Sequence, residues 1–155
     1  MAKASLSVKN ARIKGTLEDL TGLSDYPCGV RAYSQNHHEL VVAVNDPDYT
    51  LEAGFCLWFP LTGCFEGPLQ WVGADFCLGT RDEWEEILSI VRPSGDLKEE
   101  FIKHHVLFVL KRPAFRVRIL AFDCHKVAGI PIIHWHDPDG PRSSQDLEDS
   151  LSSVL

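Results

Sequence analysis

Residues 54–61 read GFCLWFPL, and this stretch decides the fold class. In an extended chain, Phe55 and Leu57 would point to one face and Cys56 and Trp58 to the other, because side chains alternate along a strand. Both faces are then apolar, which is typical of a strand that is covered on both sides. The stretch therefore predicts a β-strand in the interior of the protein.

Further strands are predicted on both sides of this stretch. Residues 29–34 (GVRAYS) and 39–45 (ELVVAVN) are typical of a hairpin whose strands are joined by residues 35–38. Residues 5–14 (SLSVKNARIK) alternate apolar and polar side chains, which predicts another strand. A glycine-proline turn signal precedes one more predicted strand, at 69–78.

The second half of the chain adds a predicted three-stranded meander, at 106–110, 115–122 and 130–136. All these strands together predict a single α+β domain over residues 1–140, built mainly on an antiparallel sheet of roughly six to eight strands. Residues 141–155 change to a polar, acidic composition. We expect this tail to form a short helix or to be disordered.

One amphipathic helix is predicted at 80–92. Thr80 and Glu83 have the spacing of a capping box, and Pro93 ends the helical pattern. The apolar residues of this segment fall at helical spacing and should face the core: Trp84, Ile87, Leu88 and Val91. A second, shorter helix is predicted at 96–104.

The overall composition narrows the class of protein. Hydrophobic residues make up 45% of the 155 residues and charged residues 24%, which excludes a disordered chain, a collagen-like repeat and a coiled coil. No apolar run is long enough to cross a bilayer, and the start, MAKASLSVKN, has no apolar segment typical of a secretory signal. We therefore expect a cytoplasmic protein without a membrane association.

The charge balance bears on the partner. The chain has 15 Lys and Arg against 22 Asp and Glu, for a formal charge of −7. Nucleic acid is an unexpected partner for such a chain, because binding it normally requires a basic surface. Acidic residues are dense between positions 82 and 100, and they form the predicted binding surface for a basic protein: Asp82, Glu85, Glu86, Glu99 and Glu100.

The cysteines indicate reduced thiols. Their number is odd, no C-x-x-C pair occurs, and three of them lie in apolar surroundings. Free cysteine packs as a small hydrophobic side chain, so we expect burial rather than a disulfide framework or a thiolate zinc site. The five positions are Cys28, Cys56, Cys64, Cys77 and Cys124.

A pair of histidines gives the alternative function. If residues 130–136 form a strand, His134 and His136 share one face and Asp137 follows in the next turn. Imidazole and carboxylate groups in this arrangement suit zinc or another divalent transition metal. A third ligand could come from elsewhere in the same half: His104, His105 or His125. Structural histidines before an ordinary Asp-Pro turn explain the same pattern without a metal.

Two functions from different classes follow. The first is a small acidic binding protein without a cofactor, an inhibitor or antidote that occludes a basic partner, which would be steered by charge. The second is a small metal-dependent enzyme with His134 and His136 as ligands, in which Arg116 and Arg118 orient an anionic substrate. No nucleotide-binding or nucleophile-elbow motif is present, which favours the first.

Overall fold

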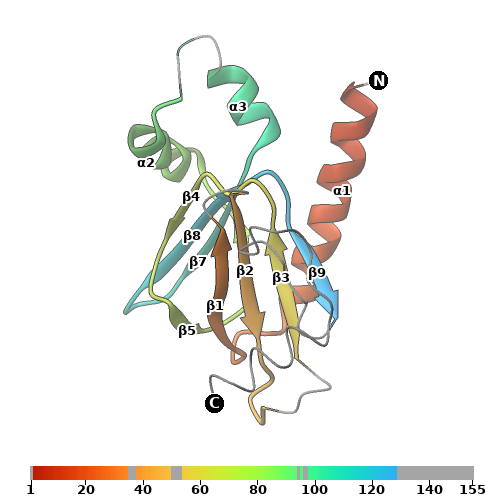
Figure 1. Cartoon of the computed structure of the whole chain (residues 1–155), viewed down its shortest axis with the longest axis vertical. Coiled ribbons are helices and arrows are strands. Elements are labelled where there is room, and N and C mark those ends of the chain that lie inside the picture. The colour runs from red at the N-terminus through yellow and green to blue at the C-terminus, as the bar shows by residue number, and fades with distance from the viewer. Residues whose placement is uncertain (1, 35–37, 50–53, 94, 96–97, 129–155) are drawn as a thin grey trace, which may run out of the picture.

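Two antiparallel sheets enclose one core in this protein, whose structure is a computed structural model (Figure 1). Of the helices in the described part of the chain, α2 and α3 lie at one end of the sheets, and α1 lies along their side. The structure describes residues 2–34, 38–49, 54–93, 95 and 98–128.

The larger sheet, sheet A, has five strands in the order β5-β1-β2-β3-β9. Its strands are β1 (Pro27–Ser34), β2 (Glu39–Val44), β3 (Phe55–Phe59), β5 (Gln70–Val72) and β9 (His125–Ala128). The expected hairpin is confirmed, because β1 pairs with β2 antiparallel, with a bulge between Val30 and Ala32. The interior strand is confirmed as well, since every residue of β3 except Trp58 is buried.

The smaller sheet, sheet B, has four strands in the order β4-β8-β7-β6. Its strands are β4 (Cys64–Glu66), β6 (Cys77–Leu78), β7 (Val106–Lys111) and β8 (Arg116–Ala121). The fold class is therefore confirmed as α+β and antiparallel, although the described strands divide between two sheets instead of forming one. Strands β7 and β8 are neighbours and pair antiparallel along their whole length, from Val106 with Ala121 to Lys111 with Arg116.

The two sheets face each other across a shared apolar core. Phe59 of sheet A meets Phe108 of sheet B edge to face, with ring centroids 5.3 Å apart. Phe76 lies against the other side of Phe59 at 6.3 Å and against Trp71 at 6.4 Å. Edge-to-face ring pairs at such distances contribute about 0.5–1.5 kcal/mol each beyond the apolar area that they bury, so they help to hold the two sheets together.

The predicted strand at 5–14 is wrong, because these residues belong to helix α1 (Ala2–Leu20). The helix is held to the core by Ile13, Leu17 and Leu20, which recur at helical spacing and are buried. Ile13 lies near the end of the alternating stretch, and Leu17 and Leu20 follow it. The packing of these three side chains against the core therefore outweighs the local alternation. The side chain of Val8, one of the apolar residues of the alternating stretch, is 69% exposed.

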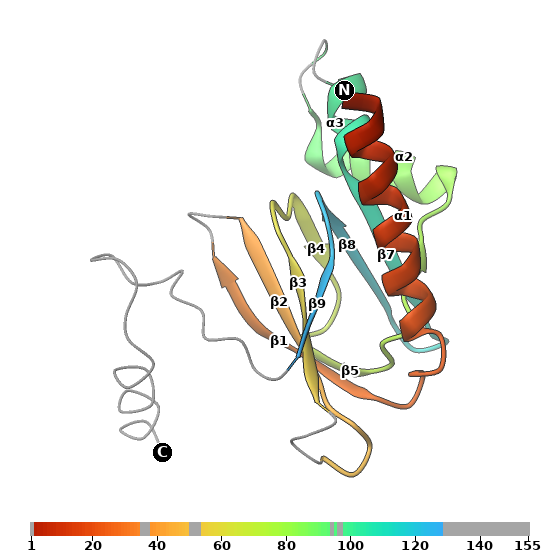
Figure 2. The same ribbon diagram turned by 90° about the vertical axis from the view of Figure 1, so that its right-hand side faces the viewer.

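Lys9 connects α1 to two segments that are distant from it in the sequence. Its Nζ donates hydrogen bonds to the carbonyl oxygens of His104 at 2.8 Å and of Phe122 at 2.9 Å. The same Nζ lies 3.8 Å from the centroid of the Phe122 ring. Arg12, one turn further, forms an ion pair with Asp123. Figure 2 shows the result, with α1 lying along the sheets beside β9. No helix among the described residues is long and apolar enough to cross a membrane.

The predicted strand at 69–78 is divided between the two sheets. Residues 70–72 pair with β1 as β5, and residues 77–78 pair with β7 as β6. The chain changes direction at Gly73, where φ is +125° and an added Cβ would lie 2.6 Å from Nη2 of Arg112. Only glycine fits that conformation and that approach without strain, so the residue makes the crossing possible.

The first two strands of the predicted meander are confirmed as β7 and β8. After β8, the chain crosses back to sheet A, where β9 pairs with β3 from Trp58–His125 to Phe55–Ala128. Pairing between strands so far apart in sequence leaves no local signal, which is why the sequence analysis did not predict β9. The predicted third strand, 130–136, and the predicted tail, 141–155, lie outside the described residues.

The predicted amphipathic helix is confirmed as α2 (Arg81–Val91). Thr80 Oγ1 accepts from the Glu83 backbone N–H at 3.3 Å, and Glu83 Oε1 accepts from the Thr80 N–H at 3.0 Å, which completes the capping box. Of the apolar stripe, Ile87 is fully buried over sheet B, while Trp84 is only partly buried. The second predicted helix is confirmed as α3 (Lys98–His104), and residues 96–97 of the prediction lie outside the described residues.

The docking of α1 can be tested by two substitutions on that helix. Leu20→Ala should lower the free energy of unfolding by about 2–5 kcal/mol, because the Leu20 side chain has no exposed surface and its removal leaves a cavity. Val8→Ala should change it by less than about 0.5 kcal/mol. Chemical denaturation followed by circular dichroism measures both. A similar small effect for the two variants would contradict the docked position of α1.

Candidate functional site

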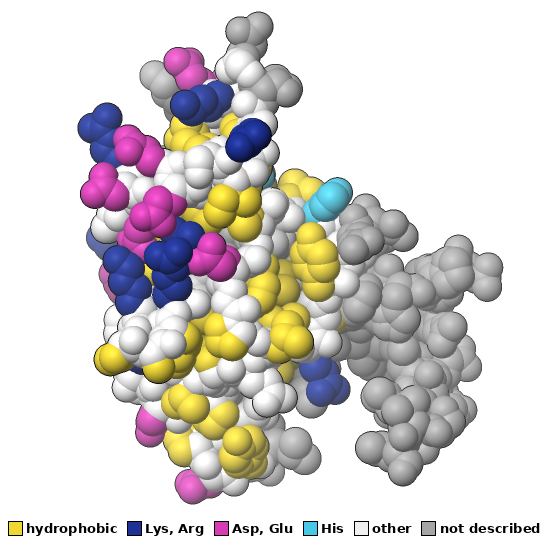
Figure 3. Space-filling view, turned by 90° about the vertical axis from the view of Figure 1, so that its left-hand side faces the viewer, with side chains coloured by type: hydrophobic (Ala, Val, Ile, Leu, Met, Phe, Trp, Pro, Cys, Tyr) yellow, Lys and Arg dark blue, Asp and Glu magenta, His cyan; other side chains and the backbone are white. Residues whose placement is uncertain are grey.

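The five predicted partner-binding acids lie on the two helices at one end of the molecule. All five side chains are exposed, three of them on α2 and two on α3. Figure 3 shows that Lys and Arg side chains lie among the acids on this face. The local charge is therefore mixed, and the contacts of each acid decide which of them are available to a partner.

Glu86 is held by the sheet beneath it. Arg118 of β8 is 2% exposed, and its Nη1 donates to Oε2 of Glu86 at 2.6 Å. On its other side, Arg118 donates through Nη2 and Nε to the two carboxylate oxygens of Glu66, at 2.8 and 3.2 Å. Arg116 adds a bond to Glu66 Oε1 at 2.9 Å. The carboxylate of Glu86 therefore neutralises a buried cation and joins α2 to sheet B.

The same cluster shifts two acid–base equilibria. The hydrogen bonds from Arg118, helped by Arg116, hold the pKa of Glu66 below its ordinary value. Burial by itself would lower the pKa of Arg118, but its bonds to Glu66 and Glu86 outweigh that effect and leave its pKa raised. Arg118, which the enzyme hypothesis assigned to an anionic substrate, is thus already paired with two carboxylates.

Glu83 is likewise engaged. It is 7% exposed, it completes the cap of α2, and its Oε2 lies 3.4 Å from Nζ of Lys111 on β7. Burial would raise the pKa of Glu83, yet the hydrogen bonds from Thr80 and the charge of Lys111 outweigh it, and the pKa is lowered. Glu83 therefore serves the attachment of α2.

Four of the predicted acids remain free to meet a partner. Glu85 makes only an exposed pair with Arg81 at 3.6 Å, and Glu100 one with His104 at 3.2 Å. Within the described residues, Asp82 and Glu99 have no ion pair. Exposed pairs of this type contribute little to stability, so they are easily exchanged for a partner's charges.

Exposed hydrophobic side chains lie next to this charged end. Figure 3 shows them on the same face, below the charges. Strands β1 and β5, which border that side, carry Tyr33 and Val72, and Leu69 precedes β5 directly; their exposed fractions are 44%, 49% and 69%. A band of apolar side chains beside charged ones is the usual composition of a protein–protein interface.

The predicted metal ligands His134, His136 and Asp137 lie outside the described residues, so the alternative function stays a prediction. Among the described residues, no group of three or more His, Cys, Asp or Glu is placed to hold a metal ion. The histidines considered as a third ligand have other contacts: His104 with Glu100, His105 with the Phe101 carbonyl, and His125 stacked on Trp58.

All five cysteines are described, and all are free thiols. Burial raises the pKa of Cys28 and of Cys124 to about 12, and it also raises the pKa of Cys56 and Cys64. A thiol with a raised pKa is a poor nucleophile, because the thiolate is the reactive form. Cys77 differs in being exposed.

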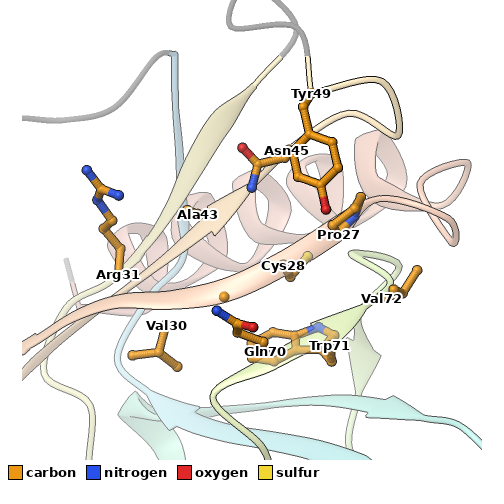
Figure 4. Close-up of a pocket in the computed structure, with 11 residues that line it drawn as sticks. Pro27, Cys28, Val30, Arg31, Ala43, Asn45, Tyr49, Gln70, Trp71 and Val72 are labelled. Atoms are coloured by element: carbon orange, nitrogen blue, oxygen red, sulfur yellow. The ribbon is translucent and has the colours of Figure 1, made fainter.

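A hollow of about 480 Å³ lies beside β1, β2 and β5, and the sequence analysis did not predict it. Gly29 and Ala43 pair across β1 and β2, and because neither has a large side chain, the sheet surface is recessed at this point. Figure 4 shows the Tyr49 ring pointing toward Pro27 at one end, and Arg31 pointing away from β1 at the other. The signal that could have revealed it is the presence of very small residues at facing positions of neighbouring strands.

A scan against protein-family models, a search of curated proteins and a search of solved structures each found no match.

The ion cluster makes a testable prediction about pH. Glu66→Gln should lower the free energy of unfolding at neutral pH by about 1–2 kcal/mol, less than for a fully buried pair because Glu66 is 35% exposed. A lowered pKa in the folded state means that this contribution is complete above 4.5, the ordinary pKa, and is lost as the pH falls below it. The difference between wild type and variant should therefore vanish in acid.

Denaturation curves at a series of pH values measure this difference. Glu85→Gln is the matched control, because it removes a carboxylate from an exposed pair and should change stability by less than about 0.5 kcal/mol. If Glu66→Gln behaved like this control at neutral pH, the bonds between Glu66 and Arg118 would not contribute to the stability of the fold.

Proposed function

We propose that this protein is a binding protein whose helical end and adjacent apolar band contact a partner protein with a basic surface. The observation that carries the proposal is the position, on one face of the molecule, of exposed acids and exposed hydrophobic residues (Figure 3). In such an interface, the apolar residues supply most of the affinity, and the charges around them guide the encounter.

The apolar part reaches the helices themselves. Ile90 lies one turn after Glu86 on α2 and is 58% exposed, and Ile102 lies one turn after Glu99 on α3 and is 39% exposed. Each helix thus offers an aliphatic side chain close to an acid. This pairing supports a contact surface that includes both helices.

The acids divide into two roles under this proposal. Asp82, Glu85, Glu99 and Glu100 are exposed and attract the basic partner before contact. Glu86 instead fixes the position of α2 through Arg118 at 2.6 Å, and its reversal would disturb the fold. A test of steering must therefore leave Glu86 unchanged.

The proposal predicts that charge reversal on the helices slows association. With the partner recovered by affinity capture, Glu85→Lys combined with Glu99→Lys should reduce its association rate on the order of tenfold at low salt, and much less at high salt, because ions screen exposed charges. The dissociation rate should change little. Surface plasmon resonance at several salt concentrations measures both rates.

Glu18→Lys combined with Asp19→Lys is the matched control. It changes the net charge by the same amount at two exposed positions of α1, away from α2 and α3. We expect a small effect of this control on the association rate. If the two double variants slowed association equally, only the net charge would matter, and the proposed surface would be wrong.

A further inference from the structure

The side of sheet A that faces away from sheet B, its outer face, carries a second apolar surface. Strand register places Gly29, Ala43, Cys56 and Val127 in one row across β1, β2, β3 and β9. A second row contains Ala32, Val41, Trp58 and His125. Most of these side chains are apolar, and they lie on the opposite side of the strands from the core.

Water is nevertheless excluded from the middle of this face. Cys56 has no exposed surface and Val41 is 2% exposed. Within the described residues, the partly buried hydrophobic side chains that pack against this cluster are Ala43 and Trp58. Figure 2 shows α1, α2 and α3 on the side of sheet B, so no helix of the described residues lies over the outer face. Sheet B, in contrast, has α2 packed over its own outward residues Leu107 and Val109.

We infer that residues 130–136 of this chain fold back across the outer face of sheet A and cover it. The described chain ends at Ala128 in β9, the edge strand of that sheet, and residues 130–136 read IPIIHWH. Crossing from β9 to β1 covers three strand spacings, about 14 Å, whereas seven extended residues reach about 23 Å. The segment is therefore long enough and starts at the right edge.

The outer face of sheet A and the segment proposed to cover it are complementary in shape and charge. The face is low at Gly29 and Ala43, where the hollow of about 480 Å³ begins, and large side chains such as Ile133 and Trp135 fill a trough of this kind. Alternation along an extended chain puts these two on the same side. The acidic residues that follow in the sequence, Asp137 and Asp139, complement the charge of Arg31, which partly offsets the burial that raises the pKa of the Cys56 thiol.

The thiol of Cys56 reports on this cover in the full-length chain. A charged thiol reagent, followed by mass spectrometry of peptides, gives the labelling rate of each cysteine separately. Ile133→Asp combined with Trp135→Asp should raise the rate at Cys56 on the order of tenfold, because the sheet-facing side chains are then too polar to stay. Ile132→Asp combined with His134→Asp changes the opposite side of the segment and should leave the rate unchanged.

Other cysteines serve as references in the same experiment. The exposed Cys77 should be labelled at one rate in every variant, and the core residues Cys28 and Cys124 should stay protected unless the whole protein unfolds. Equal rates at Cys56 in both double variants would overturn the inference. So would protection of Cys56 that depends on protein concentration, since the cover would then belong to a second copy.

Hydrogen exchange of the unmodified protein tests the same cover without any substitution. Amides in residues 130–136 should exchange at least about tenfold more slowly than those in residues 143–153 of the same chain. Equally fast exchange in both segments would show that residues 130–136 cover nothing.

Discussion

The architecture depends on β3 and β7, two central strands that are apolar on both of their faces. Where these strands face each other, Phe59 and Phe108 close the shared core with ring centroids 5.3 Å apart. Their other faces require separate covers, because an apolar sheet face left in water is unfavourable by about 25 cal/mol for each Å². On sheet B, α2 supplies this cover, and the ions beneath it determine where the helix sits.

The position of α2 shows how a buried cation can specify geometry. Arg118 is 2% exposed and would be costly without its partners, so both Glu66 and Glu86 must stay within reach. Since Glu66 lies on β4 and Glu86 on α2, the guanidinium joins three elements at one point. Apolar packing alone would let the helix slide along the sheet, whereas this set of bonds fixes its register.

Sequence patterns predicted the elements whose signals are local. The β1–β2 hairpin has two runs rich in strand-forming residues that are close in sequence, and the capping box of α2 needs only Thr80 and Glu83. The elements that the sequence did not predict, α1 and β9, depend on long-range contacts that outweigh local preference. Helix α1 is stabilised by the docking of Ile13, Leu17 and Leu20, and β9 pairs with β3, which is far away in the sequence. The acids of α2 were found, but their partners Arg118 and Lys111 lie on strands formed later in the chain, so nothing local indicated that Glu86 and Glu83 were engaged.

The bonds of Lys9 also set an order of events during synthesis. Its two carbonyl partners follow it by 95 and 113 residues, so α1 leaves a ribosome long before its docking site exists. At usual elongation rates, the delay lasts roughly 5 to 20 seconds, far longer than a helix needs to form or to melt. During this interval Ile13, Leu17 and Leu20 lack the core partners that β7 and β8 supply, such as Phe108 and Ile119, and a nascent-chain chaperone would find them accessible. The helix is made early and docks late.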